Sequence, residues 1–459
     1  MTAVAENWLE LLDRHLRARP ARYADARYLL RDTLRIRVED DQSNVHFERT
    51  RGGFVRAAIG SAWGGAAFNT KDQLPGACAM AWSAARMTGG KPMVIAGAPP
   101  AVARLRLKPR SDPRGIPAAE KAALMRQAVE VMRASPRVVS ARATYTETVG
   151  TRFVVTDRGS AVEEEFMELA VALRAAARAG DVTELGNFDC ASGNDFAAVR
   201  SCLAGAREAA AAAVQLLDAE PVEVGRRTVV LHPTLAGTLI HESLGHFCEA
   251  DNVMGDKYLE KKMRIGARIA SPILDLSDDP GVTGARACYR YDDEAVEARR
   301  TALVREGRLV GLLHTRQTAA RFGVEPTGHA RTVGHRFAPL PRMSVTCIHP
   351  GLSTLDELLR GAEGGIYMSR SFGGETEGEN FHLSAARVHR IEGGRIGTPL
   401  RSAAVIGNTF EMLKSLDGVA DDQVLVDGSF YCGKGDQYPL AVGMAAPHIR
   451  VADVMVGPI

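Results

Sequence analysis

Three features that mark exported or membrane proteins are missing from the sequence. The first thirty residues carry five arginines among acidic residues, which breaks up the apolar stretch that a signal peptide needs. No apolar run approaches the length of about 20 residues that spans a bilayer. The seven cysteines are scattered, odd in number and without a CxxC pair, so a disulfide framework is not expected. These absences predict a cytoplasmic protein in a reducing compartment.

The sequence also lacks an excess of charge of either sign. Its 57 basic and 55 acidic residues leave a formal net charge of +2, which indicates neither a nucleic acid nor an anionic membrane as a partner. Hydrophobic residues make up 46% and charged residues 24%, which is the profile of a globular protein. Because 459 residues are too many for one ordinary core, more than one domain is expected.

The order of the hydrophobic patterns predicts an α+β fold with two main regions. Residues 1–220 are expected to form an N-terminal α/β domain, with a weaker boundary near residue 95, and residues 221–459 a strand-rich C-terminal domain. Helices are predicted from the start to about 35 and over 117–134, 163–179 and 195–218, and strands over 34–45, 53–68, 137–147, 150–164 and 222–232. A Pro-, Gly- and Arg-rich passage, 92–117, is expected to be a linker or a long loop, and the sequence does not indicate its function.

The segment 233–251, PTLAGTLIHESLGHFCEAD, carries the most informative pattern. Its proline suits the first position of a helix that would bear His241, Glu242 and His246. In the familiar H-E-x-x-H zinc motif the histidines are four residues apart, but here a spacing of five turns the second about 140° away from the first. A π-bulge would bring both imidazoles to one side, and Gly245 would lower the cost of that irregularity. We therefore predict a distorted helix whose two histidines hold one metal ion.

The spacing does not identify the third ligand that a catalytic zinc requires. Glu249, Asp251, His232 and Cys248 are candidates by position, and Glu249 could share the helical face of His246 because it lies three residues beyond it. The alternative interpretation is that the histidines are core or capping residues and that the glutamate of the motif is a solvated helix residue.

Several blocks of the sequence resemble the TldD/PmbA family of metallopeptidases. HESLGHFCEAD at 241–251 is similar to the H-E-x-x-x-H motif of this family, and GGFVRAAIGSAWGGAAFNT at 52–70 is similar to its N-terminal signature. Further similar blocks follow in family order and end with FYCGKGDQYPLAVGMAAP at 430–447. The resemblance covers most of the chain and is weakest over about 90–220.

The resemblance implies a zinc ion, one per chain, held by His241, His246 and Cys432. In TldD-like members a cysteine of the C-terminal C-G-K-x-x-Q segment joins the two histidines, and CGKGDQ at 432–437 is the matching segment. A thiolate is a sensible third ligand because it is soft, which favours zinc over metals that prefer oxygen, and it leaves the fourth position for water.

The predicted reaction is hydrolysis of a peptide bond without a covalent intermediate. Glu242 would take a proton from the zinc-bound water and return it to the leaving amine. Glu249 and Asp251 are assigned to support of the histidines. The tetrahedral oxyanion needs a second hydrogen-bond donor besides zinc, and the candidates are Arg342, Lys434, His335 and His382. Each of these four is more often a plain structural or surface residue than an oxyanion donor.

The resemblance also implies partners. Family members degrade unfolded or short peptides, and some trim leader peptides, so an extended peptide is the expected substrate, held by an exposed sheet edge beside the metal. The chain would form a homodimer or a heterodimer with a PmbA-like (TldE) subunit, which lacks the metal motif. Two other hypotheses are a structural zinc site in a binding protein and a catalytically silent partner subunit.

Overall fold

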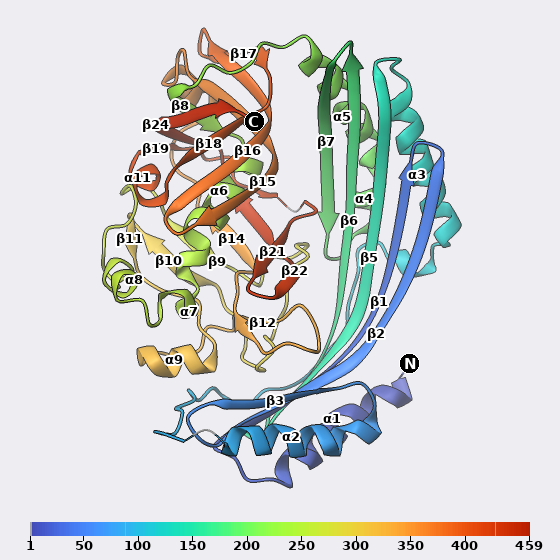
Figure 1. Ribbon diagram of the computed structural model, residues 1–459, viewed down its shortest axis with the longest axis vertical. Helices are drawn as coiled ribbons and strands as arrows, with labels where there is room; N and C mark the ends of the chain where they lie inside the picture. Colours follow the sequence, from blue (N-terminus) through green and yellow to red (C-terminus); the bar gives the residue numbers. More distant parts are fainter. Residues whose placement is uncertain (1, 88, 427) are drawn as a thin grey trace.

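The N-terminal half is built on one sheet of very long antiparallel strands. The computed structural model describes residues 2–87, 89–426 and 428–459, and Figure 1 shows this sheet running along the whole molecule. The strand order is β3-β2-β1-β5-β6-β4, with β7 paired to β6. The strands are β1 (Tyr23–Glu39), β2 (Gln42–Ala58), β3 (Trp63–Phe68), β4 (Val102–Leu105), β5 (Val138–Thr156), β6 (Ala161–Ala179) and β7 (Val182–Ser192).

Two groups of helices cover this sheet at opposite ends (Figure 1). At one end α1 (Thr2–Arg17) and α2 (Leu74–Arg86) enclose an aromatic core that includes the stacked rings of Trp8 and Tyr28. At the other end α3 (Ala118–Arg133) and α5 (Cys202–Leu217), with the short α4 (Phe196–Arg200), pack on β5, β6 and β7. The long strands therefore link two separate cores.

The C-terminal half contains two larger sheets and two short hairpins. The first sheet joins β8 (Gly225–Leu231), β15 (Ile366–Glu377), β16 (Asn380–Glu392), β17 (Arg395–Leu400), β18 (Ala403–Asn408), β19 (Leu416–Val419) and β24 (Ile449–Pro458). The second joins β9 (Leu276–Asp278), β10 (Thr301–Arg305), β11 (Arg308–Leu309), β14 (Val345–Ile348), β20 (Val424–Val426) and β23 (Gly443–Ala446). The hairpins pair β12 (Ala330–Arg331) with β13 (Leu340–Pro341) and β21 (Tyr431–Lys434) with β22 (Gln437–Ala441).

Helix α6 (Pro233–Ile240) lies in the centre of the C-terminal half, where it contacts strands of both larger sheets. Its apolar side chains belong to the largest hydrophobic core of the protein. The remaining helices are short: α7 (Ala250–Val253), α8 (Lys257–Lys262), α9 (Arg316–Phe322), α10 (Leu355–Arg360) and α11 (Thr409–Lys414). Among the described residues, no helix combines the length and the apolar character needed to cross a membrane.

The predicted α+β class, with a strand-rich C-terminal region, is confirmed: 24% of the residues are helical and 43% lie in strands. Several element predictions were wrong, and β5 continues through the break expected between 147 and 150. The first helix ends at Arg17 rather than near residue 35, and residues 163–179 form most of strand β6 instead of a helix. Buried and partly exposed residues alternate from Val171 to Ala177, so burial at a period of two outweighed the helix propensity of alanine.

We propose to keep the division of the chain near residue 220. Within the described part of the chain, strands β1 to β7 pair only with one another, and β8 begins the second set of sheets. A further boundary near residue 95 stays a prediction, although β1 before it pairs along most of its length with β5 after it. The passage 92–117 contains only the short β4 and a turn of 3-10 helix, Pro113–Gly115.

Candidate metal centre

The helix that carries both histidines is distorted where the motif requires it. Helix α6 begins with Pro233 at its first position, and the side chain of His232 accepts a hydrogen bond from the Thr234 amide (3.2 Å). From His241 to Gly245 the chain forms a π-helical turn, which a 3-10 turn follows. The predicted distortion is therefore confirmed, and the extra residue of the π-turn compensates for the spacing of five.

Gly245 serves this turn in a different way from the predicted one. Its φ of −56° and ψ of −46° are ordinary helical values that any residue adopts, so no unusual backbone freedom is used. A Cβ atom at this position would instead lie 2.1 Å from Sδ of Met343. The glycine is needed because the neighbouring segment approaches the helix so closely.

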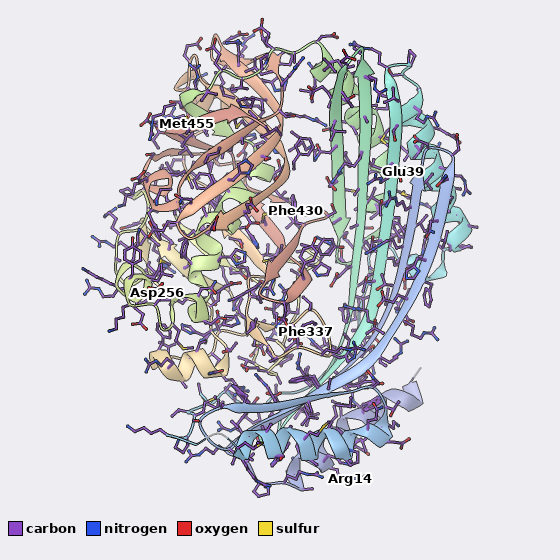
Figure 2. All side chains as sticks on the ribbon, in the orientation of Figure 1. Arg14, Glu39, Asp256, Phe337, Phe430 and Met455 are labelled. Carbon is purple, nitrogen blue, oxygen red and sulfur yellow. The ribbon has the colours of Figure 1, made fainter. Side chains whose placement is uncertain are left out.

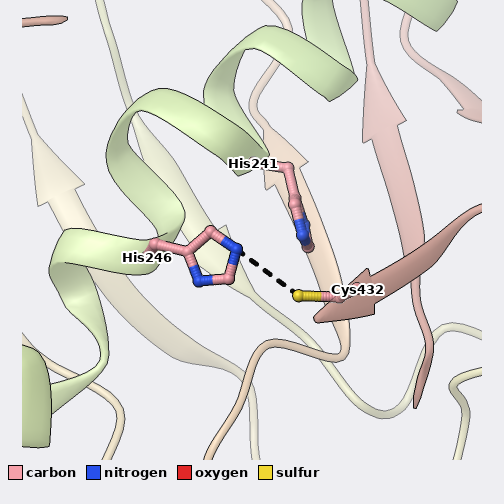
Figure 3. Close-up of side chains that lie close together, drawn as sticks. All are labelled: His241, His246 and Cys432. Carbon is pink, nitrogen blue, oxygen red and sulfur yellow. Dashed lines mark hydrogen bonds between the residues drawn. The ribbon is translucent and has the colours of Figure 1, made fainter. Parts of the chain in front are cut away.

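Cys432 reaches the histidines from the β21–β22 hairpin (Figure 3). Its sulfur lies 3.4 Å from Nε2 of His246, and ligand atoms of His241, His246 and Cys432 all lie within 4.8 Å of one another. The two imidazole rings are nearly perpendicular, at 78°, with centroids 5.3 Å apart. Zinc bonds of about 2.0–2.3 Å to nitrogen and sulfur fit three ligand atoms at such separations.

The chemistry of these donors fits a metal ion. The His241 side chain is buried, and neither of its ring nitrogens has a hydrogen-bond partner among the described residues, which is costly unless something else binds them. Burial alone would raise the pKa of the Cys432 thiol, but the two adjacent histidines outweigh burial and lower it to about 5. The thiol is therefore prepared as a thiolate, the form that binds zinc.

A buried carboxylate orients the second histidine from behind. Nδ1 of His246 lies 3.0 Å from a carboxylate oxygen of Glu249, which leaves Nε2 facing the sulfur. Burial would raise the pKa of Glu249, but His246, Lys434 and Arg342 lower it to about 2. Burial likewise would lower the pKa of His246, but Cys432 and Glu249 raise it to about 10. The predicted support of His246 by Glu249 thus has direct geometric backing.

Two cations connect this carboxylate to the cysteine hairpin. Nζ of Lys434, two residues after Cys432, lies 3.0 Å from Glu249 and 2.6 Å from Asp251. The guanidinium of Arg342 donates to the backbone carbonyl of Cys432 (3.0 Å), and its Nε lies 3.9 Å from Glu249. Asp251 therefore acts on Lys434 and not directly on a histidine, so it holds the hairpin to the helix.

Glu242 occupies the more open side of the cluster. Its carboxylate lies 3.9 Å from Nε2 of His246, and 24% of its side chain is exposed. Burial raises the pKa of Glu242 above its ordinary value, although the two histidines oppose that shift. Strand β15 fixes its backbone, because the Thr376 hydroxyl donates to the Glu242 carbonyl (2.7 Å) and Gly374 lies beside its side chain. A carboxyl group of raised pKa beside the candidate ligands is suited to move a proton.

The other candidates from the sequence lie outside this cluster. His232 caps α6, and Cys248 is fully buried with the pKa of its thiol raised well above the ordinary value by burial, so neither joins the metal-ligand group. Of the candidate oxyanion donors, Arg342 and Lys434 are bound to the Glu249 network, and Nε2 of His335 lies 3.2 Å from Oδ1 of Asn69. His382 lies on β16 opposite a residue of β15.

Two family models match the chain. The PmbA/TldA metallopeptidase C-terminal domain matches residues 224–458, and the corresponding central domain matches residues 111–217. The first match alone covers more than half of the chain.

The chain belongs to the PmbA/TldD metallopeptidase family. A metalloprotease of Methanothermobacter thermautotrophicus is 35% identical over 445 residues, which cover 95% of each chain. A zinc metalloprotease TldD homolog of Saccharolobus solfataricus is 33% identical over 246 residues, covering 53% of this chain and 54% of that protein. The solved structure of TldE from Thermococcus kodakarensis superposes with a TM-score of 0.74 at 18% identity over 99% of both chains, which shows the same fold.

Sequence reasoning missed part of what surrounds this PmbA/TldD site. Arg342 and Lys434 were considered only as oxyanion donors, and Met343 was not considered at all. Lys434 lies inside the CGKGDQ segment, so its nearness to Cys432 was a usable signal. No sequence signal places Arg342 beside Glu249, because 93 residues separate them in the chain.

Proposed function

We propose that the protein is a zinc-dependent peptidase whose ion is held by His241, His246 and Cys432. The observation that carries this proposal is the convergence of these three side chains from a π-helical turn and a distant hairpin. A zinc ion bound there would supply a Lewis acid that acidifies water and polarises a carbonyl group. The zinc metalloprotease among the relatives supports the choice of metal, and so does the thiolate ligand.

Glu242 takes the role of proton carrier in this proposal. Burial raises the pKa of Glu242 toward the working pH of a cytoplasmic enzyme. A carboxyl group with such a pKa can both accept a proton from water and return it to the leaving amine. Glu249 keeps Nδ1 of His246 occupied, so that Nε2 of this ring stays directed toward the cysteine sulfur. Lys434 and Asp251 hold the hairpin that carries Cys432 against the helix.

The substrate in this proposal is an extended peptide that adds to strand β15. Residues 371–377 of β15 pair with β16 on one side, whereas β8 pairs with β15 only over 366–368. In the described part of the chain, no strand pairs with the edge of residues 371–377 that faces away from β16. This open edge belongs to β15, whose Thr376 donates a hydrogen bond to the Glu242 carbonyl. A substrate bound there would be recognised by its main chain, which suits unfolded or short peptides, leader peptides included.

The TldE fold match suggests a second subunit. We propose that the chain works as a homodimer or together with a TldE-like subunit, and the free thiols of Cys78, Cys248, Cys288, Cys347 and Cys432 suit the reducing cytoplasm. A silent partner subunit and a structural metal site remain the competing functions. Measurements of zinc content and peptide hydrolysis on one purified preparation distinguish both of them from a peptidase.

The test compares Glu242→Gln with wild type on an unstructured peptide. We expect about one zinc per chain in both proteins and a fall in kcat/KM of at least about a hundredfold in the variant. The matched control is Glu411→Gln, which changes an exposed glutamate of α11 and should leave turnover unchanged. Equal turnover in the Glu242→Gln variant would exclude Glu242 as the proton carrier.

The competing functions make different predictions for wild type. A structural zinc site predicts bound zinc, no hydrolysis, and unfolding when a chelator removes the ion. A silent partner subunit predicts little or no zinc after purification. Zinc analysis together with peptide hydrolysis therefore separates the three functions.

A further inference from the structure

A cavity of about 1100 Å³ lies between the long N-terminal sheet and the C-terminal half. Strands β1, β2, β5 and β6 supply one wall, and the β21–β22 hairpin with the loop 332–337 supplies the other. Figure 2 labels Phe337 of this loop where the C-terminal half faces the sheet. This volume slightly exceeds the roughly 300–1,000 Å³ typical of small-molecule sites, so a segment of polypeptide fits.

The walls of this cavity carry an excess of positive charge. Nine arginines line it against four acidic residues, Glu48, Glu164, Glu168 and Asp293. The two buried acidic residues, Glu164 and Asp293, already form ion pairs with Arg152, at 2.8 Å and 3.1 Å. The chain as a whole is nearly neutral, so this concentration of arginine is local.

Four of the lining arginines form no ion pair with any described residue. They are Arg31, Arg35, Arg331 and Arg336. Arg331 is almost completely buried, and within the described part of the chain its guanidinium donates hydrogen bonds only to the main-chain carbonyls of Met343 and Ala441. Because arginine stays charged in proteins, these groups leave a positive potential that an anion would offset.

The cavity adjoins the candidate metal centre through the cysteine hairpin. Tyr431 lines the cavity, and the next residue is Cys432, whose side chain faces the histidines instead. Across the hairpin Tyr431 pairs with Ala441, the residue whose carbonyl accepts from Arg331. Anything bound in the cavity would therefore lie one strand away from the cluster.

We propose that this cavity binds an acidic stretch of the polypeptide substrate, next to the segment that reaches the metal centre. This inference rests on the proposed peptidase function and adds a substrate class to it. Carboxylates suit the site because guanidinium groups bind them with paired, charge-assisted hydrogen bonds. A peptide is favoured over a nucleic acid because the arginines line a space between two halves of one chain, instead of an outer surface that a duplex could follow.

The experiment compares two unstructured, labelled peptides that differ only in a run of glutamates replaced by glutamines. Binding is measured by fluorescence anisotropy with the Glu242→Gln protein, and kcat/KM is measured with wild type. We expect the glutamate peptide to bind at least about fivefold more tightly, with an advantage that added salt reduces. The double variant Arg35→Gln/Arg336→Gln should remove most of this advantage and change binding of the glutamine peptide by at most about twofold.

The matched control is Arg321→Gln/Arg395→Gln, which removes the same charge from exposed arginines of α9 and β17 that do not line the cavity. Equal binding of the two peptides, or equal losses in both double variants, would overturn the inference. Tighter binding of a single-stranded oligonucleotide that depends on Arg35 and Arg336 would overturn it in favour of a nucleic-acid site. Selective binding of the glutamate peptide without hydrolysis of either peptide would instead count against the peptidase function alone.

Discussion

The candidate metal centre and the arginine-lined cavity treat charge in opposite ways. In the metal centre each buried charge has a partner: Glu249 is flanked by Lys434 and His246, and Lys434 also binds Asp251. In the cavity the carboxylates pair with only some of the arginines, and the hydrogen bonds that the structure gives the buried Arg331 go to main-chain carbonyl groups. Both regions border the same β21–β22 hairpin.

This difference indicates a division of labour between the two regions. A matched network fixes ligand geometry, because every side chain in it is held by another. An unmatched set of cations gains from a ligand that brings the missing negative charge. The first arrangement suits catalysis, and the second suits capture of substrate.

The contrast between the metal centre and the cavity predicts its largest effect at Cys432, the proposed thiolate ligand. Cys432→Ala should reduce bound zinc to well below one per chain and peptide turnover by at least about a thousandfold, because the metal loses its thiolate ligand. The control is Cys347→Ala, which changes a buried cysteine of β14 outside the cluster. Metal analysis and initial rates check the prediction, which full zinc content in the Cys432→Ala variant would contradict.

The matched charges of the metal centre should show in the pH dependence of stability. The pKa of Glu249 is lowered to about 2, so its ionised form contributes stability above its ordinary pKa near 4.5 that is lost as the pH falls toward 2. Glu249→Gln should lower the free energy of unfolding by on the order of 3 kcal/mol at pH 7, and by progressively less below pH 4.5.

Urea unfolding of both proteins across this pH range measures the effect. Glu411→Gln is again the control, since Glu411 is exposed on α11. A difference between wild type and Glu249→Gln that does not change with pH would show that the carboxylate is not held ionised by its neighbours.

Close packing around the helix that carries the histidines should make substitution of Gly245 destabilising. Gly245→Ala would push a methyl group against the buried side chain of Met343, and we expect a loss of about 1–3 kcal/mol in the free energy of unfolding. Gly76→Ala in α2 is the matched control, because apart from the helix's own backbone and the chain neighbours no described atom lies within 4 Å of the new Cβ, and it should be neutral or stabilising by up to about 1 kcal/mol. Thermal or urea unfolding that ranks the two variants the other way would contradict the packing argument.

The smallest effect is expected in the cavity. Arg35→Gln/Arg336→Gln should change the free energy of unfolding by less than about 0.5 kcal/mol, because both arginines are exposed and neither forms an ion pair with a described residue. A clear loss of stability would mean that these arginines are structural, and the contrast with Glu249 would disappear. Urea unfolding beside wild type gives the answer.

Local patterns in the sequence were sufficient for the metal helix. The spacing of His241 and His246 predicted a distorted helix, which the structure contains as a π-turn, and the distance of Glu249 along the chain made it a candidate for the face of His246. Cys432 came only from the resemblance to a family. Nothing in its own surroundings distinguishes it from a buried cysteine, since 186 residues separate it from His246.

Long-range features could not be predicted in this way. Strand β6 was mistaken for a helix because its alanines have high helix propensity, whereas its partners β5 and β7 decide its conformation. The cavity is formed by residues from both halves of the chain, and a net charge of +2 conceals its arginines. Such sites become visible only when the fold brings distant segments together.

The central claim is that two imidazoles and one thiolate hold the same zinc ion. X-ray absorption at the zinc edge of the purified protein tests this claim most directly. The account predicts one sulfur at about 2.3 Å and two imidazole nitrogens at about 2.0–2.1 Å. A first shell without sulfur in a protein that carries one zinc per chain would contradict it.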